Sequence, residues 1–437
     1  MRSVKDIYSK VNFSRSIKKS TNFTAIDGTS PIFERTIATE SFESVAATVG
    51  SDFGIQEQIR QLFGKRGLPN AKIGGHPHFN NLEVEKRQSY GYAVSLFMDI
   101  KGSTKLGLIY PPEDVFFIKN VIIKCAIETI QAFDGHVHRI MGDAVLAFFR
   151  SDGLSARNSA IDAINCGTYL VEFMRQKVAP ELQANDLQED IGIRVGIDYG
   201  TDDNVLWGMY GYPGFSEVTA TSFYVDVAAK LQQTAPRNRV MIGNSIKEFL
   251  DLHDDVVEQK LITVDNTRQP EPFLLPNYSL DDGKKINYRK YVISHKKYFN
   301  LLPKPENASK PISITSSLKA KEGIQSNDEY YACSRSIEKP FGIEFKAHFN
   351  LPQPFEEVKV RFRVENYGKD AEEHGGDDRG NHENFVAARQ RDDGSYFAKH
   401  WENTNYIGLH YMYISVWTNE TMYYSEQCFA VYIGPSK

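Results

Sequence analysis

The feature that most constrains this sequence is the segment Tyr92–Ile100, YAVSLFMDI, which is apolar almost throughout but carries Asp99 at its end. A short, nearly continuous apolar run bounded by turn residues is typical of a buried β-strand. GlySerThr at 102–104 ends the run. Because an isolated charge is costly to bury, the carboxylate of Asp99 has to be paired or bound to a cation. The segment therefore predicts a strand and a candidate site at its end.

Helix-like and strand-like segments alternate after this strand. Apolar residues recur near helical spacing through Glu113–Phe133. His136–Met141 and Ala144–Phe149 predict a hairpin whose turn is Gly142–Asp143. Further elements are expected as helices at 156–177, 222–234 and 245–251, strands at 191–198 and 239–242, and a glycine-rich stretch at 200–214. Such alternation indicates an α/β or α+β domain, which we expect at residues 89–293.

The segments on either side of this domain have other patterns. Residues 1–88 are rich in Ser, Thr, Asn, Gly and charged residues, with one helix-like stretch at Ile55–Phe63. We interpret them as a tail and a short adaptor segment without a core of their own. Residues 294–315 contain Lys, Pro and Ser, which predicts a linker. From 316 to 437 the chain is aromatic, and it alternates apolar with polar residues in Val358–Val364, which predicts an all-β sandwich domain.

Composition excludes several classes of protein. Hydrophobic residues make up 41% and charged residues 24% of the 437, close to the averages of soluble globular proteins. No apolar run approaches the ~18 residues of a membrane helix, and the N-terminus lacks the apolar core of a signal peptide. We therefore expect no membrane partner. The net charge of −5 argues against a protein that coats nucleic acid, and the basic first 20 residues are interpreted as a solvated tail. The four cysteines form no CxxC pair, which fits a reducing, cytoplasmic location.

A second aspartate strengthens the site predicted at Asp99. Asp143 lies at the tip of the expected hairpin, directly after Gly142. Two carboxylates from adjacent strand ends can hold one or two divalent metal ions. The loop Lys101–Thr104 precedes a helix and offers backbone N–H groups, which suit phosphate. Together these residues suit a metal-assisted displacement at phosphorus.

Five blocks of the sequence resemble, in order, the motifs of class III nucleotidyl cyclases. The two metal motifs are matched by MDIKGST at 98–104 and HRIMGDAVLAF at 138–148. The other three motifs are matched by GIRVGIDYG at 192–200, LWGMYG at 206–211 and YVDVAAK at 224–230. In the C-terminal third, VKVRFRVENYGKDAEE and WENTNYIGLHYMYISV are similar to the β-sandwich sensor domain behind bacterial defence cyclases. The chain thus resembles the pyrimidine nucleotide cyclases of Pycsar-type anti-phage systems.

The resemblance implies a reaction and a set of ligands. In this family the 3′-hydroxyl of a nucleoside triphosphate attacks its own α-phosphorus, and pyrophosphate leaves. Asp99, Asp143 and the carbonyl of Ile100 are implied to bind two Mg²⁺ or Mn²⁺ ions. The residues implied to bind the β- and γ-phosphates are Lys101, Gly102, Ser103 and Thr104. The resemblance also implies a homodimer in which one protomer supplies the metal aspartates and its partner the base-reading groups.

The choice of base is expected to rest on Arg139, where purine cyclases of this family carry Lys for adenine or Glu for guanine. Arg carries only donors in a fixed fork, so GTP is disfavoured. Cytosine presents the acceptors O2 and N3 side by side, whereas an N3–H donor separates O2 from O4 in uracil. A bidentate Arg contact therefore favours CTP over UTP. The second base position implied is Thr219, whose hydroxyl can donate or accept and excludes no base.

Two residues depart from the family pattern. Asp226 stands where the family usually has Asn near the ribose, and Lys230 stands where it has the Arg that stabilises the transition state. At i, i+4 on a helix the two can pair with each other. We expect both to be catalytic, in a site that is either re-tuned for a smaller base or weakened.

The sequence therefore predicts a homodimeric, metal-dependent cytidylate cyclase of anti-phage defence, whose cyclic CMP acts on a separate effector protein. Three alternatives stay open. They are a uridylate cyclase, an adenylate cyclase in which Arg139 replaces Lys, and a non-catalytic nucleotide-binding module in which the changes at Asp226 and Lys230 have abolished turnover. Retention of both Asp99 and Asp143 weighs against the last, because a pure binder has less need of two metal ligands.

Overall fold

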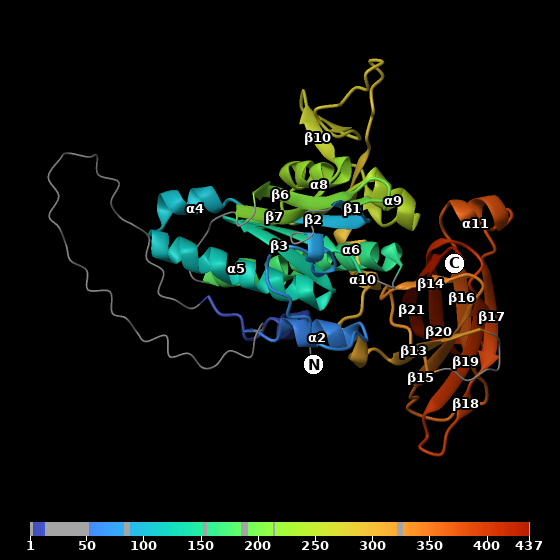
Figure 1. The fold of residues 1–437 in the computed structure, drawn as a ribbon. Coiled ribbons are helices and arrows are strands. Elements are labelled where there is room, and N and C mark those ends of the chain that lie inside the picture. The colour runs from blue at the N-terminus through green and yellow to red at the C-terminus, as the bar shows by residue number, and fades with distance from the viewer. Residues whose placement is uncertain are drawn as a thin grey trace.

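The structure is a computed structural model that describes residues 3–13, 52–82, 88–151, 155–184, 191–212, 215–320 and 327–436. Figure 1 shows a mixed helix and sheet domain, coloured blue to yellow, and a C-terminal domain of strands, coloured orange to red. The α/β (α+β) class expected for the first domain and the all-β class expected for the second are both confirmed. No helix among the described residues is long and apolar enough to cross a membrane.

A seven-stranded sheet forms the centre of the first domain, in the order β3-β4-β2-β5-β8-β12-β9. Its strands are β2 (Ala93–Lys101), β3 (Gly135–Met141), β4 (Ala144–Phe149), β5 (Gly192–Gly200), β8 (Arg239–Gly243), β9 (Val257–Glu258) and β12 (Lys290–Ile293). Strand β2 lies between β4 and β5 and is antiparallel to both, whereas β5 and β8 are parallel. Burial on both faces explains why the segment Tyr92–Ile100 is apolar almost throughout.

Helices cover both faces of this sheet (Figure 1). They are α4 (Ser103–Ile109), α5 (Pro112–Ala132), α6 (Ala156–Phe173), which continues through a π-helical turn (Met174–Val178) into α7 (Ala179–Ala184), α8 (Phe223–Thr234) and α9 (Asn244–Leu250). In β5, Val195 contacts Gly167 of α6, whereas Gly196 lies against Ala228 of α8. Because successive strand residues face opposite sides of a sheet, α6 and α8 cover opposite faces.

The N-terminal segment joins this core instead of forming a solvated tail, so that prediction is wrong for residues 3–13. Helix α2 (Ile55–Leu62) packs against α5 (Figure 1), and α1 (Val4–Ile7) packs against α2 and the π-helical turn. Ile7, Tyr8 and Phe13 are fully buried, and the Tyr8 hydroxyl donates to the carbonyl of Tyr169 at 3.2 Å. Lys5 and Lys10 are exposed, so a count of charge conceals the apolar face of this segment. Residues 14–20 of the expected tail lie outside the described residues.

The linker expected at 294–315 is also wrong. Its residues form α10 (His295–Leu301), the 3₁₀ helix η3 (Pro305–Ser309) and the start of strand β13 (Ile312–Lys319). Tyr298 is fully buried, and its hydroxyl donates to Asn165 Oδ1 at 2.9 Å and lies 3.0 Å from the hydroxyl of Tyr432. Lys and Pro suggested an exposed connector, but the aromatic residues between them pack between the two domains.

The glycine-rich stretch at 200–214 contributes to a second, three-stranded sheet in the order β1-β6-β7. Its strands are β1 (Gln88–Tyr90), β6 (Leu206–Tyr212) and β7 (Phe215–Thr221). Gly211 has φ +97°, a conformation that favours glycine, while Gly214 lies outside the described residues. Trp207 of β6 is fully buried and stacks on Phe79 of the 3₁₀ helix η1 (Pro77–Phe79), with ring centres 4.3 Å apart. A separate hairpin of β10 (Leu261–Val264) and β11 (Thr267–Pro270) projects beyond α8 (Figure 1).

The C-terminal domain is a sandwich of a four-stranded and a five-stranded sheet. The first has the order β13-β15-β19-β18, with β15 (Gly342–Phe349), β19 (Tyr396–Asn403) and β18 (Arg389–Gln390). The second has the order β14-β21-β20-β16-β17, with β14 (Ser336–Glu338), β21 (Thr421–Gly434), β20 (Gly408–Thr418), β16 (Val358–Glu365) and β17 (His382–Ala387). The short helix α11 (Lys369–His374) follows β16. A hydrophobic core that includes Phe345 and Phe362 lies between the sheets, as the alternation in Val358–Val364 indicated.

Candidate active site

The two aspartates of the predicted site lie at one edge of the central sheet. Asp99 on β2 pairs in register with Ala144 on β4, the residue after Asp143. The backbone N–H of Ile100 donates to the carbonyl of Asp143 at 3.2 Å. The hairpin turn therefore brings Asp143 beside Asp99 and Ile100, although more than 40 residues separate them along the chain.

Each carboxylate has a cationic partner from the chain itself. Arg194 on β5 donates from Nε to Asp99 Oδ1 at 2.9 Å, and its Nη2 forms an ion pair with Oδ2. These hydrogen bonds raise the pKa of Arg194. Asp143 accepts a hydrogen bond from the hydroxyl of Ser103, and Lys119 Nζ lies 4.0 Å from it. Both of these partly buried carboxylates thus have a positive charge nearby.

Arg194 was not assigned a role from the sequence. It belongs to the quoted block GIRVGIDYG, and it is the direct register partner of Asp99 across β2 and β5. The sequence feature that could have indicated a role for Arg194 is its place as a single basic residue near the start of an apolar strand. Its guanidinium also donates from Nη1 to the carbonyl of Gln233 in α8 at 2.8 Å, so it links the aspartate to that helix.

The donor set at this edge fits a divalent metal ion. Carboxylate and main-chain carbonyl oxygens are the hard ligands that Mg²⁺ and Mn²⁺ prefer. The side chains of Asp99 and Asp143 are 17% and 32% exposed, so both are open to solvent while remaining anchored. Arg194 and Lys119 already neutralise part of the negative charge of Asp99 and Asp143, the two carboxylates expected to bind such an ion.

The predicted phosphate loop leads directly into α4. Gly102 is the residue before the helix and has φ +91°, a backbone conformation that glycine adopts without strain. Ser103 is buried, whereas Lys101, Gly102 and Thr104 are exposed. The first N–H groups of a helix have no acceptor within the helix. The loop therefore offers backbone N–H donors close to Asp143, because the Ser103 hydroxyl donates a hydrogen bond to that carboxylate.

Arg139 lies on β3 and is held by Glu217 of β7. Its Nε donates to Glu217 Oε1 at 3.1 Å, and its Nη2 forms an ion pair with Oε2. His138 Nε2 lies 3.1 Å from the same Oε1, and the His138 side chain is fully buried. Thr219 is half-buried on the same face of β7 as Glu217, two residues further along. Glu217 is thus a charged member of the candidate base site that no local sequence pattern indicates, because its partner Arg139 lies on a distant strand.

Asp226 and Lys230 both lie on α8, as their spacing predicts, but they do not form the ion pair that this spacing allows. Asp226 is exposed in the first turn. Lys230 is half-buried, and its Nζ lies 5.7 Å from the centre of the Tyr278 ring. The neighbour of the Lys230 ammonium group is therefore the Tyr278 ring and not the Asp226 carboxylate.

Asp198 is a buried titratable residue outside the predicted site. It lies on β5, is fully buried, and accepts hydrogen bonds of 2.6 Å from Ser245 Oγ and from the Tyr288 hydroxyl. Burial raises the pKa of this carboxyl to about 7. The contacts join β5 to α9 and to the segment before β12, which indicates a structural role.

Comparison with known families agrees with both domains. Residues 85–276 match the model of the adenylate and guanylate cyclase catalytic domain. Residues 288–434 match the model of the adenylyl/guanylyl and SMODS C-terminal sensor domain. Class III cyclases use divalent metal ions, which the carboxylate oxygens of Asp99 and Asp143 suit.

Three curated relatives extend over most of the chain. A cytidylate cyclase from Escherichia coli is 42% identical over 392 residues, which cover 87% of this chain and 83% of the relative. A second cytidylate cyclase from Escherichia coli is 32% identical over 417 residues, 90% of each chain. A third, from Staphylococcus aureus, is 33% identical over 365 residues, 82% of each chain. With its paired aspartates, its catalytic domain and its C-terminal sensor domain, the chain belongs to the cytidylate cyclase family of class III nucleotide cyclases.

Proposed function

We propose that this protein is a cytidylate cyclase that converts CTP to 3′,5′-cyclic CMP and pyrophosphate. The observation that carries the proposal is the pair Asp99 and Asp143 at one sheet edge, beside the loop that begins at Gly102. The names of the relatives, which are similar to this chain over at least 82% of its length, support cytidine as the base.

Asp99, Asp143 and the carbonyl of Ile100 would hold two Mg²⁺ or Mn²⁺ ions. Such ions would lower the pKa of the 3′-hydroxyl and neutralise charge on the triphosphate. Arg194 fixes the orientation of the Asp99 carboxylate, and Ser103 that of Asp143. Both hydrogen bonds reduce the reorganisation needed when a cation arrives.

The triphosphate lies against the loop of Lys101, Gly102, Ser103 and Thr104, which offers backbone N–H donors and one ammonium group. Lys230 contributes a positive charge to the transition state, and Asp226 accepts from a ribose hydroxyl. The two are free for these roles because they do not pair with each other. Arg139 and Thr219 contact the base, with Arg139 donating to O2 and N3 of cytosine.

The active form is proposed to be a homodimer with its sites at the interface. Tyr212 and Phe215, at the end of the β6–β7 hairpin, are 81% and 88% exposed in the single chain. Exposed aromatic side chains of this size are typical of protein interfaces. The cyclic product would act on a separate effector in anti-phage defence, in the cytoplasm, where the four free cysteines of this chain suit a reducing environment.

The test is product formation from ATP, GTP, CTP and UTP by the purified full-length protein with Mg²⁺ or Mn²⁺. We expect cyclic CMP from CTP, and a rate for Asp143→Asn at least 100-fold lower, on the order of other losses of transition-state stabilisation. Asp393→Asn, at an exposed position of the sandwich, is the matched control. Cyclic UMP or cyclic AMP as the main product would show that the enzyme selects uracil or adenine instead of cytosine. The absence of product from all four triphosphates would favour a non-catalytic nucleotide-binding module.

A further inference from the structure

A large cavity separates the catalytic domain from the sensor domain. Its volume is about 1730 Å³. One wall consists of residues after α2, the end of α5, the first turns of α6, and parts of β5 and α9. The other wall consists of 327–338 and the end of β21 in the sensor domain. The residues that line the cavity include none of the candidate active site.

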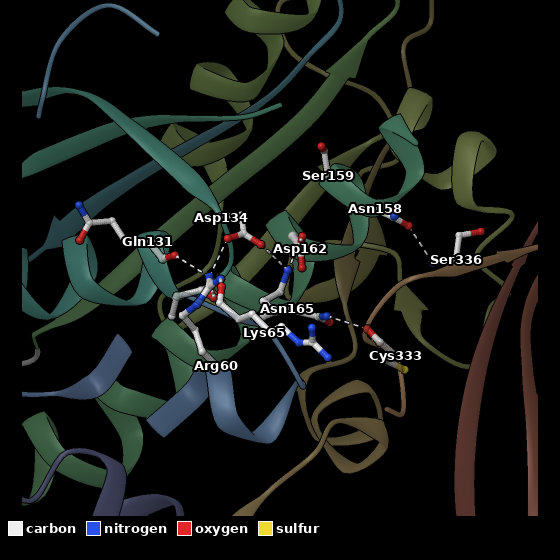
Figure 2. Close-up of polar contacts among 12 residues, drawn as sticks. Arg60, Lys65, Gln131, Asp134, Asn158, Ser159, Asp162, Asn165, Cys333 and Ser336 are labelled. Atoms are coloured by element: carbon white, nitrogen blue, oxygen red, sulfur yellow. Dashed lines mark hydrogen bonds and ion pairs between the residues drawn. The ribbon is translucent and has the colours of Figure 1, made fainter. Parts of the chain in front are cut away.

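Helix α6 forms the floor of this junction. Its residues Asn158 and Asn165 hold the sensor domain: the N–H of Ser336 donates to Asn158 Oδ1 at 2.9 Å, and Asn165 Nδ2 donates to the carbonyl of Cys333 at 2.9 Å. Figure 2 shows both contacts beside the polar cluster of the catalytic wall. A molecule in the cavity therefore contacts the helix on which the sensor domain is docked.

The catalytic wall carries guanidinium groups that lack a negative partner. Arg157, in the first turn of α6, stacks on the ring of Phe249 with its guanidinium carbon 4.6 Å from the ring centre. Neither Arg157 nor the exposed Arg66 forms an ion pair with any carboxylate of the described residues. Burial lowers the pKa of Arg157, and the nearby charge of Asp251 opposes this shift only in part. Its Nη1 donates to the carbonyl of Phe249, which carries no net charge. An anion in the cavity would complete the compensation.

The acidic residues of the same wall already have cationic partners. Lys65 Nζ lies 2.8 Å from Asp134 Oδ2 and 2.9 Å from Asp162 Oδ2, and Arg60 Nη1 lies 2.6 Å from Asp134 Oδ1 (Figure 2). The excess charge of the wall is therefore positive, and it resides in Arg66 and Arg157.

One buried oxygen of this cluster has no partner. Asp162 is 6% exposed, and its Oδ1 accepts no hydrogen bond in the described structure. Leaving a buried polar atom unsatisfied costs about 1–3 kcal/mol, so native proteins rarely do it without a water, ion or ligand. Asp162 follows Arg157 by five residues on α6, and both residues line the cavity.

We propose that this interdomain cavity binds a phosphate-bearing small molecule. Its phosphate lies against the guanidinium groups of Arg157 and Arg66, and a hydroxyl or amino group donates to Asp162 Oδ1. Such a ligand has the size of a phosphorylated sugar or nucleoside. It contacts both domains at α6, so its binding favours the docked position of the sensor domain. This site is separate from the proposed cyclase function and does not depend on it.

The proposal is tested by calorimetric titration of the full-length protein with ribose 5-phosphate, inorganic phosphate and ribose. We expect ribose 5-phosphate to bind more tightly than inorganic phosphate, and ribose not to bind. Arg157→Gln should raise the Kd of both phosphates about tenfold, the loss of one charge-assisted hydrogen bond. Asp162→Asn should remove the advantage of ribose 5-phosphate over inorganic phosphate.

Two further variants keep the result interpretable. Arg66→Gln changes an exposed side chain and so tests the cavity even if Arg157→Gln does not fold, while Arg389→Gln, exposed on β18, should bind like the wild type. The proposal is overturned if neither phosphate binds the wild-type protein. It is equally overturned if Arg66→Gln and Arg157→Gln both keep wild-type affinity, because the phosphate would then be bound in the catalytic pocket.

Discussion

At the scale of single residues, the base site consists of a donor and an acceptor held together. Arg139 can donate to the base, while Glu217 beside it can only accept. Cytosine carries an N4 amino donor next to its N3 acceptor, whereas uracil carries the acceptor O4 in that place. Carboxylates are suitable acceptors for the cytosine amino group. The pair therefore suits cytosine better than Arg139 does by itself.

Glu217→Gln is expected to weaken discrimination between CTP and UTP, because an amide can also donate to O4. One base-edge contact is worth about 1–3 kcal/mol, so the ratio of kcat/KM for CTP over UTP should fall about tenfold or more. Steady-state kinetics with both substrates measures this ratio. An unchanged ratio in an active variant would show that Glu217 only orients Arg139.

Asp198 makes folding stability depend on pH. Its pKa is raised to about 7 in the folded protein, against about 3.9 in an unfolded chain. Between these values the folded state binds more protons than the unfolded state, so this contribution to stability falls as pH rises from about 4 to about 7. The neutral carboxyl is the form that the buried site prefers.

Denaturant unfolding at pH 5.5 and pH 8 tests this dependence. The wild type should lose about 2 kcal/mol more between these pH values than Asp198→Asn, whose amide does not titrate. Asp393→Asn at an exposed site should behave like the wild type. Equal losses in wild type and Asp198→Asn would mean that Asp198 stays ionised in the folded protein.

At the scale of elements, the position of α8 is set by close contact with β5. A side chain at Gly196 would place its Cβ 2.2 Å from the backbone nitrogen of Gln232 and 2.3 Å from the carbonyl oxygen of Ala228. Only glycine allows the helix to lie so near the strand. Helix α8 carries Asp226 and Lys230, and Arg194 of β5 bonds to its end at Gln233. The spacing of these elements therefore governs the active site.

Gly196→Ala is expected to displace α8, lowering stability by about 1–3 kcal/mol and reducing cyclase activity. The matched control is Gly107→Ala on α4, where a Cβ meets nothing within 4 Å and alanine favours a helix. Thermal unfolding and kcat measured together separate the two variants. Wild-type stability and activity in Gly196→Ala would contradict the close contact.

At the scale of the whole molecule, the catalytic domain is covered by other segments on one side and open on another. The N-terminal segment, α10 and the sensor domain pack around α6, where the hydroxyl groups of Tyr298 and Tyr432 lie 3.0 Å apart. The β6–β7 hairpin instead ends in exposed aromatic side chains. The open side is the one that carries Arg139 and Glu217, so a second protomer there would complete the site.

Phe215→Glu is expected to convert the protein to a monomer with greatly reduced turnover. Its own folding stability should change little, because Phe215 is 88% exposed. Analytical ultracentrifugation gives the oligomeric state, and Phe385→Glu, 48% exposed on the sandwich, is the control. An active dimer with Phe215→Glu would place the interface elsewhere.

What could be read from the sequence was local. The apolar run ending in Asp99, the helix at 112–132 and the hairpin around Asp143 follow from periodicity and turn residues, which neighbouring positions determine. The five motifs in order indicated the family. Residues 3–13 and 294–302 were misjudged because their charged and turn-forming residues hid an apolar face that becomes buried only against distant helices.

The tertiary structure alone decided which residues meet. Arg194 lies 95 positions from Asp99, and Glu217 lies 78 positions from Arg139. Strand register and the approach of two sheets created both pairs, and no local pattern encodes either. The cavity at Arg157 arises in the same way, because its walls belong to two domains. Local periodicity determines elements, whereas contacts between elements depend on packing over the whole chain.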